Sequence, residues 1–405
     1  MGERIVLGFG DNTDYEIEWD GAVLERLVDE HRVSAAELGA DGPIGGIHDL
    51  LVSILGFLRS GSGGERFVES TRIVEDFAGR FRCNVTIGGT SPRAAIAMRR
   101  LGVASALHLV TVNDHVRRLI PPDCPWVCSN GRDSVHPHLI VQFPAGGCVR
   151  AGDIAIRTRS ADRIIYSNDP DNIAMEISPD FGALATDARV LLVSGFNAMH
   201  SSALLADRLG KVRRIIRALP PGALVFFEDA GFYNPLLSMQ VRAALVDAID
   251  VYSLNEDELQ GHLGRKISLL DPRDVHAALL EMQRLVPVPA LVVHARHWAL
   301  AFGAQADRHA AALRGGIAMA TTRLRLGDEF SAADYQRTSA LPADGPGARF
   351  ATAIRALAGD RVCCVPSLRV ADGRVTTVGL GDAFVGGFLP LLAGEEQGAI
   401  RRSVR

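Results

Sequence analysis

The sequence has few cysteines and no excess of basic residues. Six of its 405 residues are cysteine, and its formal net charge is −4. So few cysteines in so long a chain do not make a disulfide framework, and we expect reduced thiols in a cytoplasmic protein. The lack of a basic excess argues against nucleic acid or an anionic membrane as a partner.

Long apolar runs are also missing. No run approaches the roughly 20 residues that a membrane-spanning helix needs. The first residues, MGERIVLGFGDN, lack the apolar core of a secretory signal and are typical of a strand. Apolar residues make up 47% and charged residues 22% of the chain, which is typical of an ordinary globular protein. The length allows one large domain with a smaller one, or two domains.

Short apolar runs alternate with amphipathic stretches along most of the chain. Several runs are almost continuous in Val, Leu, Ile and Phe, which indicates strands buried on both faces, as in a parallel sheet. We expect strands at 4–9, 104–110, 188–196, 223–230, 250–255, 290–295 and 298–303, and helices at 200–218, 236–249, 256–264 and 273–286. This alternation predicts an α/β fold with a doubly wound, mainly parallel sheet.

Two segments, 14–19 and 138–159, break this rhythm. Both alternate between apolar and polar residues, strictly so over 14–19, where Tyr15, Ile17 and Trp19 fall on one face. Strict alternation is typical of a half-exposed, antiparallel strand, so we expect a small sheet inserted into the α/β domain. The predicted boundaries place 1–12, 38–128 and 173–405 in the large domain and 13–37 and 129–172 in the small one.

The stretch GLGDAF, residues 379–384, places a tight turn and an acid where a helix begins. The start of a helix presents unpaired N–H groups and a partial positive charge, so it suits an anion. Asp382 could instead be the N-cap of the helix, because Asp is among the best capping residues. The motif alone leaves both roles open.

Polar residues and glycines follow two further strands near the N-terminus. Asn12 and Asp14 come after the first strand, at the edge where open α/β sheets bind ligands. They could bond hydroxyl groups of a ligand or simply form an Asx turn. Gly88 and Gly89 precede a helix, where they would let the backbone approach a ligand or make a plain turn.

Acids and an amide end two later strands. Glu228, Asn255 and Glu258 are oxygen donors of the kind that Mg²⁺ uses, often through water. The acids at 256–258 could equally form the acidic first turn of a helix, where the helix dipole favours them.

Two cysteines and two histidines lie close together in the sequence. Cys124, Cys128, His136 and His138 could in principle form a zinc site. The His-x-His spacing, with Pro137 between the histidines, is poor for a zinc finger.

The order of these motifs along the chain resembles the ribokinase-like superfamily of sugar kinases. SLNEDEL (253–259) and TVGLGD (377–382) are most similar to its ADP-dependent glucokinase and phosphofructokinase family. Residues 163–172 and 309–328 are similar to that family too, and the resemblance extends from Ile5 to Phe388.

The resemblance implies a ribokinase-like fold and a Mg²⁺-dependent kinase. The donor would be ADP, or alternatively ATP, and the acceptor a sugar or sugar phosphate such as glucose or fructose 6-phosphate. Asp382 would be the catalytic base, and the small sheet a lid that excludes water. The resemblance implies an anion hole made by the amides of Gly379, Leu380 and Gly381. It implies a sugar site made by Asn12, Asp14, Gly88 and Gly89. It implies a metal site made by Glu228, Asn255 and Glu258.

Three departures from the family pattern concern the donor and the acceptor. The family usually has His two residues before the acid at 228, and here that residue is Phe226. Asp162 stands before Arg163 where the family tends to have Asn. Thr-Ser-Pro-Arg follows Gly88-Gly89, where the family tends to have an amide or small residue and then Ala-Gly.

The third departure makes Arg93 and Arg163 candidate contacts for an anionic acceptor, and we assign Arg163 to the substrate site. Arg93 could instead be a solvated helix residue, and Arg163 could pair with Asp162 or Asp169. Two wider alternatives stay open: an ATP-dependent kinase of another alcohol such as a nucleoside, and a non-catalytic sugar-binding regulator.

Overall fold

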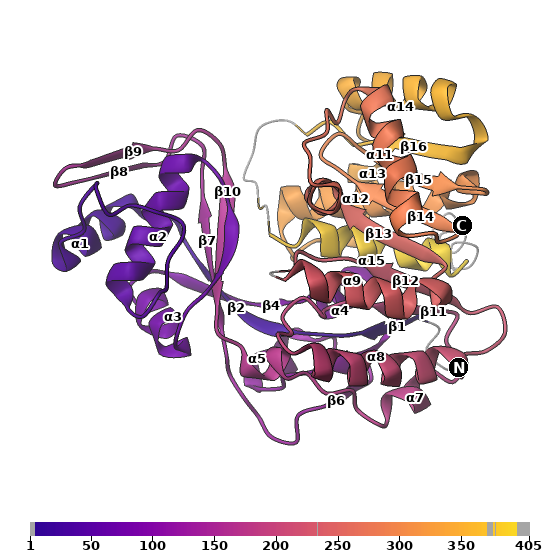
Figure 1. Cartoon of the computed structure of the whole chain (residues 1–405), viewed down its shortest axis with the longest axis horizontal. Coiled ribbons are helices and arrows are strands. Elements are labelled where there is room, and N and C mark those ends of the chain that lie inside the picture. Colours follow the sequence, from indigo (N-terminus) through magenta and orange to yellow (C-terminus); the bar gives the residue numbers. More distant parts are fainter. Residues whose placement is uncertain (1–4, 233, 371–375, 377, 395–405) are drawn as a thin grey trace.

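The computed structural model describes residues 5–232, 234–370, 376 and 378–394. A larger body contains a nine-stranded sheet, and a smaller body beside it contains a five-stranded sheet (Figure 1). A separate ribbon of β8 (Cys148–Ala151) and β9 (Ile154–Arg157) belongs to the smaller body. In the described part of the chain, no helix has both the length and the apolar character that crossing a membrane requires.

The nine-stranded sheet is parallel from β6 (Trp126–Cys128) through β14 (Ala290–His294), as the continuous apolar runs predicted. Its strands in spatial order are β16 (Val362–Pro366), β15 (Trp298–Gly303), β14 (Ala290–His294), β13 (Val251–Asn255), β12 (Leu224–Glu228), β11 (Val190–Val193), β1 (Ile5–Gly8), β5 (Ala106–Leu109) and β6 (Trp126–Cys128). Strands β15 and β16 are antiparallel to their neighbours. A three-residue turn joins β14 to β15, and so short a link allows only antiparallel pairing.

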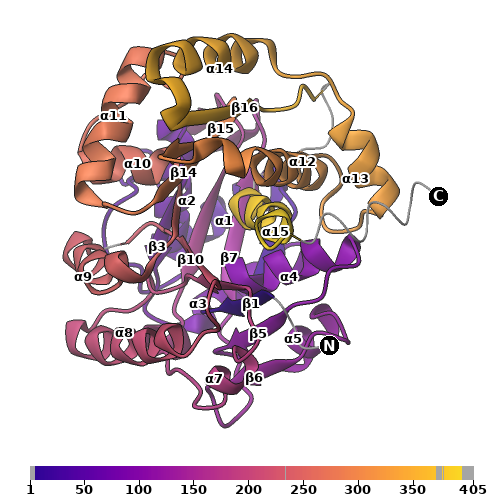
Figure 2. The same cartoon turned by 90° about the vertical axis from the view of Figure 1, so that its right-hand side faces the viewer.

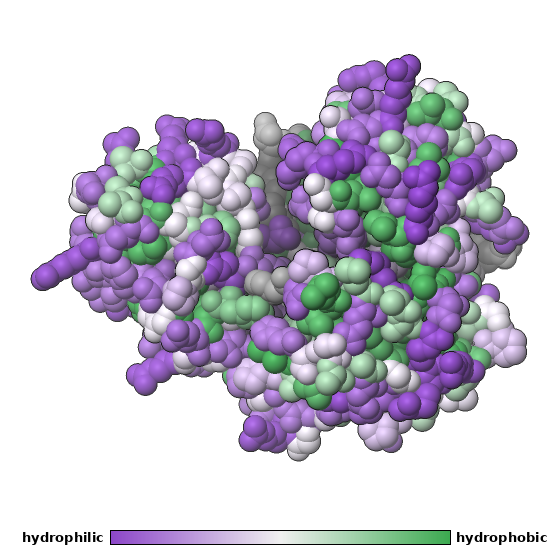
Figure 3. Space-filling model, viewed as in Figure 1, coloured by the Kyte–Doolittle hydropathy of each residue, from purple (hydrophilic) through white to green (hydrophobic). Residues whose placement is uncertain are grey.

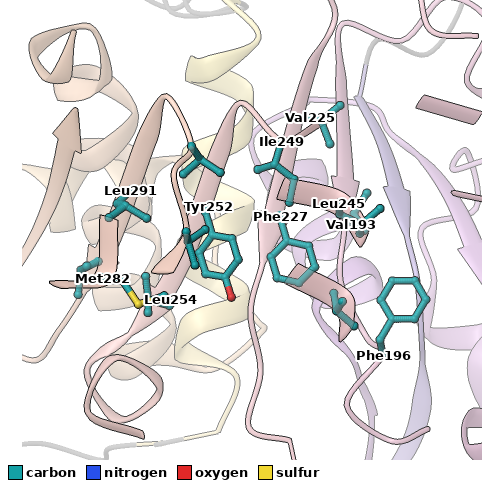
Figure 4. Packing of buried hydrophobic residues seen from close by; sticks show 14 of the residues in the cluster. Val193, Phe196, Val225, Phe227, Leu245, Ile249, Tyr252, Leu254, Met282 and Leu291 are labelled. Carbon is teal, nitrogen blue, oxygen red and sulfur yellow. The ribbon is translucent and has the colours of Figure 1, made fainter. Parts of the chain in front are cut away.

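Helices cover both faces of this sheet, so the doubly wound architecture is confirmed (Figure 2). One face packs against α8 (Ser202–Arg217), α9 (Pro235–Leu245), α10 (Glu256–Leu263), α11 (Pro272–Leu285) and α14 (Gly345–Ala358). The other packs against α4 (Thr90–Arg100), α5 (Asp114–Leu119), α12 (Ala310–Leu326) and α15 (Leu380–Leu392). Figure 4 shows the first interface, where Phe227 and Tyr252 stack with their ring centroids 5.0 Å apart.

The smaller sheet has one apolar and one polar face, as strict alternation predicted. Its strands in spatial order are β3 (Gly64–Phe67), β10 (Asp162–Ser167), β7 (His138–Phe143), β2 (Asn12–Ile17) and β4 (Cys83–Gly88). Tyr15, Ile17 and Trp19 join the apolar cluster beneath α1 (Gly21–His31), α2 (Ile47–Ser60) and α3 (Thr71–Ala78). The opposite face is turned to the larger body, because Gln142 on it accepts a hydrogen bond from Thr376 at 3.3 Å. Figure 3 shows a hollow between the two bodies, bordered largely by hydrophilic residues.

The arrangement differs from the predicted boundaries over residues 38–88. These were assigned to the large domain, yet β3 and β4 pair within the smaller sheet, and α2 and α3 pack beneath it. The physical reason is that β4 pairs with β2, about 70 residues earlier, and nothing in the local pattern of 83–88 encodes that partner.

Candidate active site

The turn before α15 stands at the centre of the site. Gly379 occupies the N-cap position with φ 65° and ψ 27°, a left-handed conformation that favours glycine. A Cβ added there would lie 2.9 Å from Arg93 Cδ and 3.2 Å from Arg323 Nε. Gly381 and Asp382 follow in the first helical turn. Because the N-cap is Gly379, Asp382 does not cap the helix, and its side chain is 24% exposed.

Arg93 in α4 joins this turn to the smaller sheet. Its Nη2 donates to Asp14 Oδ2 at 2.8 Å and to Glu16 Oε1 at 3.4 Å, and its Nε lies 3.8 Å from Asp382 Oδ2. Burial by itself would lower the pKa of Arg93, but the three carboxylates raise it overall. The interpretation of Arg93 as a solvated helix residue is therefore wrong, since only 5% of it is exposed.

A second buried guanidinium flanks the same turn. Arg323 in α12 donates from Nε to the Val378 carbonyl at 2.8 Å and pairs with Asp328. Burial, together with the nearby charge of Arg93, lowers the pKa of Arg323 to about 9. Sequence reasoning missed this residue, although it lies in the 309–328 segment that carries part of the family resemblance. Two cations therefore adjoin the start of α15, where an anion would also meet the helix dipole.

The four residues assigned to the sugar site lie together. Asn12 stands opposite Gly88 in the β2–β4 pairing and donates to Asp14. A Cβ at Gly88 would lie 2.3 Å from Asn12 Nδ2, so the glycine leaves room for this side chain. Gly89 has φ 92°, a backbone conformation that favours glycine. Burial raises the pKa of Asp14, while Arg93 opposes the rise.

Arg163 lies in β10, on the polar face of the smaller sheet, where it stands opposite Gln142. Its guanidinium forms no ion pair with the described residues. Asp162 accepts instead from the Gly63 and Arg163 amides, and Asp169 pairs with His138 at 3.3 Å. The pairing proposed for Arg163 with Asp162 or Asp169 is thus not formed. Burial raises the pKa of Glu65 in the neighbouring strand β3, and the charge of Arg163 opposes this rise.

Two of the residues assigned to the metal site, Glu228 and Asn255, end the neighbouring strands β12 and β13, and the third, Glu258, lies in the first turn of α10. Asn255 and Glu258 form a capping box: Asn255 Oδ1 accepts from the Glu258 amide at 2.9 Å, and Glu258 Oε2 accepts from the Asn255 amide at 2.8 Å. The prediction that 256–258 form the acidic first turn of a helix is confirmed, since all three acids lie in the first turn of α10. Burial, and then the charges of Asp229 and Glu228, raise the pKa of Glu258 well above its usual range.

These residues fit a divalent cation held partly through water. Glu228 is buried, and its Oε2 accepts no hydrogen bond from any described residue. A cation would offset the repulsion between this carboxylate and those of Asp229 and Glu258. Across the described ranges, no three His, Cys, Asp or Glu side chains are close enough to share one ion directly. A hard cation with several water ligands satisfies both observations.

The cysteines and histidines considered for zinc have separate partners. Cys124 donates to the Ser105 carbonyl at 2.9 Å and Cys128 to the Val110 carbonyl at 3.5 Å. His136 lies 3.8 Å from Asp171, and His138 pairs with Asp169.

His294, at the end of β14, is a site residue that the sequence reasoning missed. Its Nε2 lies 2.9 Å from Glu228 Oε1. Burial by itself would lower the pKa of His294, but Glu228, Glu256 and Asp382 together raise it overall. Phe226, which stands where the family usually has His, is buried against Phe388 with ring centroids 5.3 Å apart. The imidazole beside Glu228 comes from a strand two places away. A polar residue ending an apolar strand was the available signal.

Comparison with known proteins identifies relatives of this architecture. A sequence model of the ADP-specific phosphofructokinase/glucokinase conserved region matches residues 3–285. The comparison with curated proteins finds no match. A solved phosphofructokinase from Pyrococcus horikoshii OT3 with AMP superposes with a TM-score of 0.76 at 18% identity, covering 98% of this chain and 99% of that one.

Two further structures are similar over nearly the whole chain. An ADP-dependent kinase in complex with fructose-6-phosphate and ADPβS has a TM-score of 0.77 at 14% identity, covering 96% of this chain and 94% of that one. Adenosine kinase from Sinorhizobium meliloti has a TM-score of 0.52 at 12% identity, with coverages of 97% and 88%. At these identities the structures establish the ribokinase-like fold, and the matched region establishes the family.

Proposed function

The chain belongs to the ADP-specific phosphofructokinase/glucokinase family and is an ADP-dependent sugar kinase, and on that premise we propose that its acceptor is a hexose phosphate. The observation that carries the proposal is Arg163, a cation without an ion pair among the described residues, on the polar face of the smaller sheet. A guanidinium in such a position suits a phosphate, which it can bind with two parallel hydrogen bonds.

In the proposed mechanism, Asp382 is the base. It removes the proton from the attacking sugar hydroxyl while Asn12 and Asp14 hold neighbouring hydroxyls. Its carboxylate is partly exposed and not used for capping, which leaves it available to the acceptor. Phosphoryl transfer requires positioning and charge stabilisation more than covalent help from the protein.

The start of α15 stabilises the phosphoryl group as it moves. The amides of Gly379, Leu380 and Gly381 form the anion hole, and Arg93 and Arg323 add positive charge behind the turn. Glu228, Asn255 and Glu258 would hold Mg²⁺, which when bound neutralises charge on the diphosphate. The smaller sheet is the lid, and its polar face keeps water from the donor.

A second candidate acceptor is a neutral hexose such as glucose. Glu65 favours it, because this carboxylate interacts with Arg163 and would repel a phosphate placed there. The two acceptors can be separated by changing one charge at a time.

Replacing Arg163 by alanine distinguishes them. With a hexose phosphate as the natural acceptor, Arg163→Ala raises the KM for fructose 6-phosphate about tenfold or more. It leaves the KM for ADP and the kcat nearly unchanged, because the lost contact stabilises the bound acceptor equally in the ground state and in the transition state. Steady-state kinetics with fructose 6-phosphate and glucose, each with ADP and with ATP, provide the measurement.

The control is Glu65→Gln, which removes the opposing charge and should lower the KM for fructose 6-phosphate. A wild-type preference for glucose, together with indifference of Arg163→Ala to both acceptors, would contradict the proposal and favour a glucokinase. Transfer from ATP alone would contradict the assignment of ADP.

Replacing Glu258 by glutamine tests the metal assignment apart from the helix cap. Glutamine also fits the third position of a capping box, so helix α10 should persist. Loss of the charge should raise the Mg²⁺ concentration needed for half-maximal turnover while the KM for the sugar changes little. If the Mg²⁺ titrations of variant and wild type coincide, Glu258 serves only as a cap.

A further inference from the structure

His294 contacts both halves of the site. Its Nε2 lies 2.9 Å from Glu228 Oε1, on the metal side. On the phosphoryl side its ring stacks on Phe384, with centroids 4.7 Å apart and an angle of 28° between the planes. A Cβ built on Gly381 would lie 3.4 Å from His294 Cε1, so the imidazole also packs against the turn that carries Asp382.

The contact with Glu228 determines which carboxylate oxygen remains available. Oε1 is occupied by the imidazole, whereas Oε2 is buried and has no donor among the described residues. The side chains are 12% exposed for His294 and 6% for Glu228, so water cannot easily replace the imidazole. The partner of a ligating carboxylate holds it in one orientation, which makes metal affinity depend on that partner.

The contacts with α15 hold the helix start against the same ring. Gly381 and Phe384 are three residues apart and therefore lie on one face of the helix. His294 stands beside Asn255 in the β13–β14 pairing, so its backbone is fixed by the sheet. One rigidly placed ring thus borders the carboxylate of β12 and the first turn of α15.

We propose that His294 is a positioning residue that links the metal-side carboxylate Glu228 to the phosphoryl-side turn 379–382. The inference rests on the proposed function, since it takes Glu228 as a residue that holds a divalent cation. His294 touches neither substrate nor phosphate in this role; it acts through Glu228 and α15.

Two substitutions separate the hydrogen bond from the ring. His294→Phe keeps an aromatic ring on Phe384 but removes the donor to Glu228. His294→Gln keeps a donor but removes the ring. The probe is Mn²⁺, whose binding to the protein with ADP is followed by electron paramagnetic resonance without any acceptor. Partners of metal ligands typically contribute about 10–100-fold to affinity, so His294→Phe should weaken Mn²⁺ binding at least tenfold.

His294→Gln should bind Mn²⁺ within a few-fold of wild type but lower kcat, because the helix start loses its packing partner. Neither variant should change the acceptor KM greatly. The control is His276→Phe in α11, an edge-to-face neighbour of Phe302 with no contact to the site, which should match wild type throughout.

Equal Mn²⁺ affinity of His294→Phe and wild type would overturn the proposal. An equal loss of Mn²⁺ affinity in both variants, together with lowered melting temperatures, would also overturn the proposal, because the His294 ring would then serve packing alone. Absence of Mn²⁺ binding by wild type would overturn it too. If the Mn²⁺ pattern holds but wild type transfers no phosphoryl group from ADP, the proposed acceptor and chemistry fail while the link between His294 and Glu228 stands.

Discussion

Asp382→Asn should fold as the wild type does and lose most of its turnover. The helix start is held by Gly379 and its neighbours, so an isosteric amide removes no cap. Asparagine cannot accept the hydroxyl proton, and general-base catalysis typically contributes about 10²–10⁴-fold. We therefore expect kcat to fall by about that factor. ADP-coupled turnover gives kcat, and thermal unfolding with and without ADP checks fold and nucleotide binding.

Asp114→Asn is the matched control. Asp114 also stands in the first turn of a helix without being its cap, but its side chain is fully exposed and pairs with Arg117. Its substitution should leave kcat unchanged. Turnover of Asp382→Asn close to that of wild type would remove Asp382 from the role of base.

Arg93→Met should cost about 3–5 kcal/mol of unfolding free energy, the usual loss when one member of a buried ion pair is removed. The side chains of Arg93 and Asp14 are 4% and 5% exposed, so methionine would leave a buried carboxylate uncompensated. Chemical denaturation at neutral pH measures the loss. Arg72→Met is the control: its partner Asp76 and Arg72 itself are largely exposed, and the change should cost less than about 1 kcal/mol.

The loss in Arg93→Met should shrink as the pH is lowered. Burial already raises the pKa of Asp14, and Arg93 is the first charge that opposes this rise. Without Arg93 the folded-state pKa of Asp14 rises further above its unfolded value. A group with a raised folded pKa favours folding once it is protonated, so the variant should regain stability relative to wild type from neutral pH downwards. A stability difference that stays constant with pH would show that Asp14 is not the uncompensated charge.

Local patterns determined much of the fold. The continuous apolar runs of β1 and β11–β14 show that both faces of each strand are buried, and this requires helices on both sides of the sheet. The Asn255-x-x-Glu258 capping box and the glycine turn before α15 are also local, because each is made by residues within one helical turn. Sequence alone therefore sufficed for the sheet, the glycine turn at the start of α15 and the family resemblance.

Which distant side chains meet depends on the tertiary structure. Arg93 is buried because Asp14, 79 positions earlier, lies on a strand of the other sheet, and no local signal distinguishes it from a solvated helix arginine. His294 reaches Glu228 across the intervening strand β13, although 66 positions separate them. Residues 38–88 joined the smaller sheet through the pairing of β4 with β2. In each case the partner is determined by packing and charge between elements that are distant in the sequence. These interactions depend on the whole fold, so the residue pattern of the segment itself does not predict them.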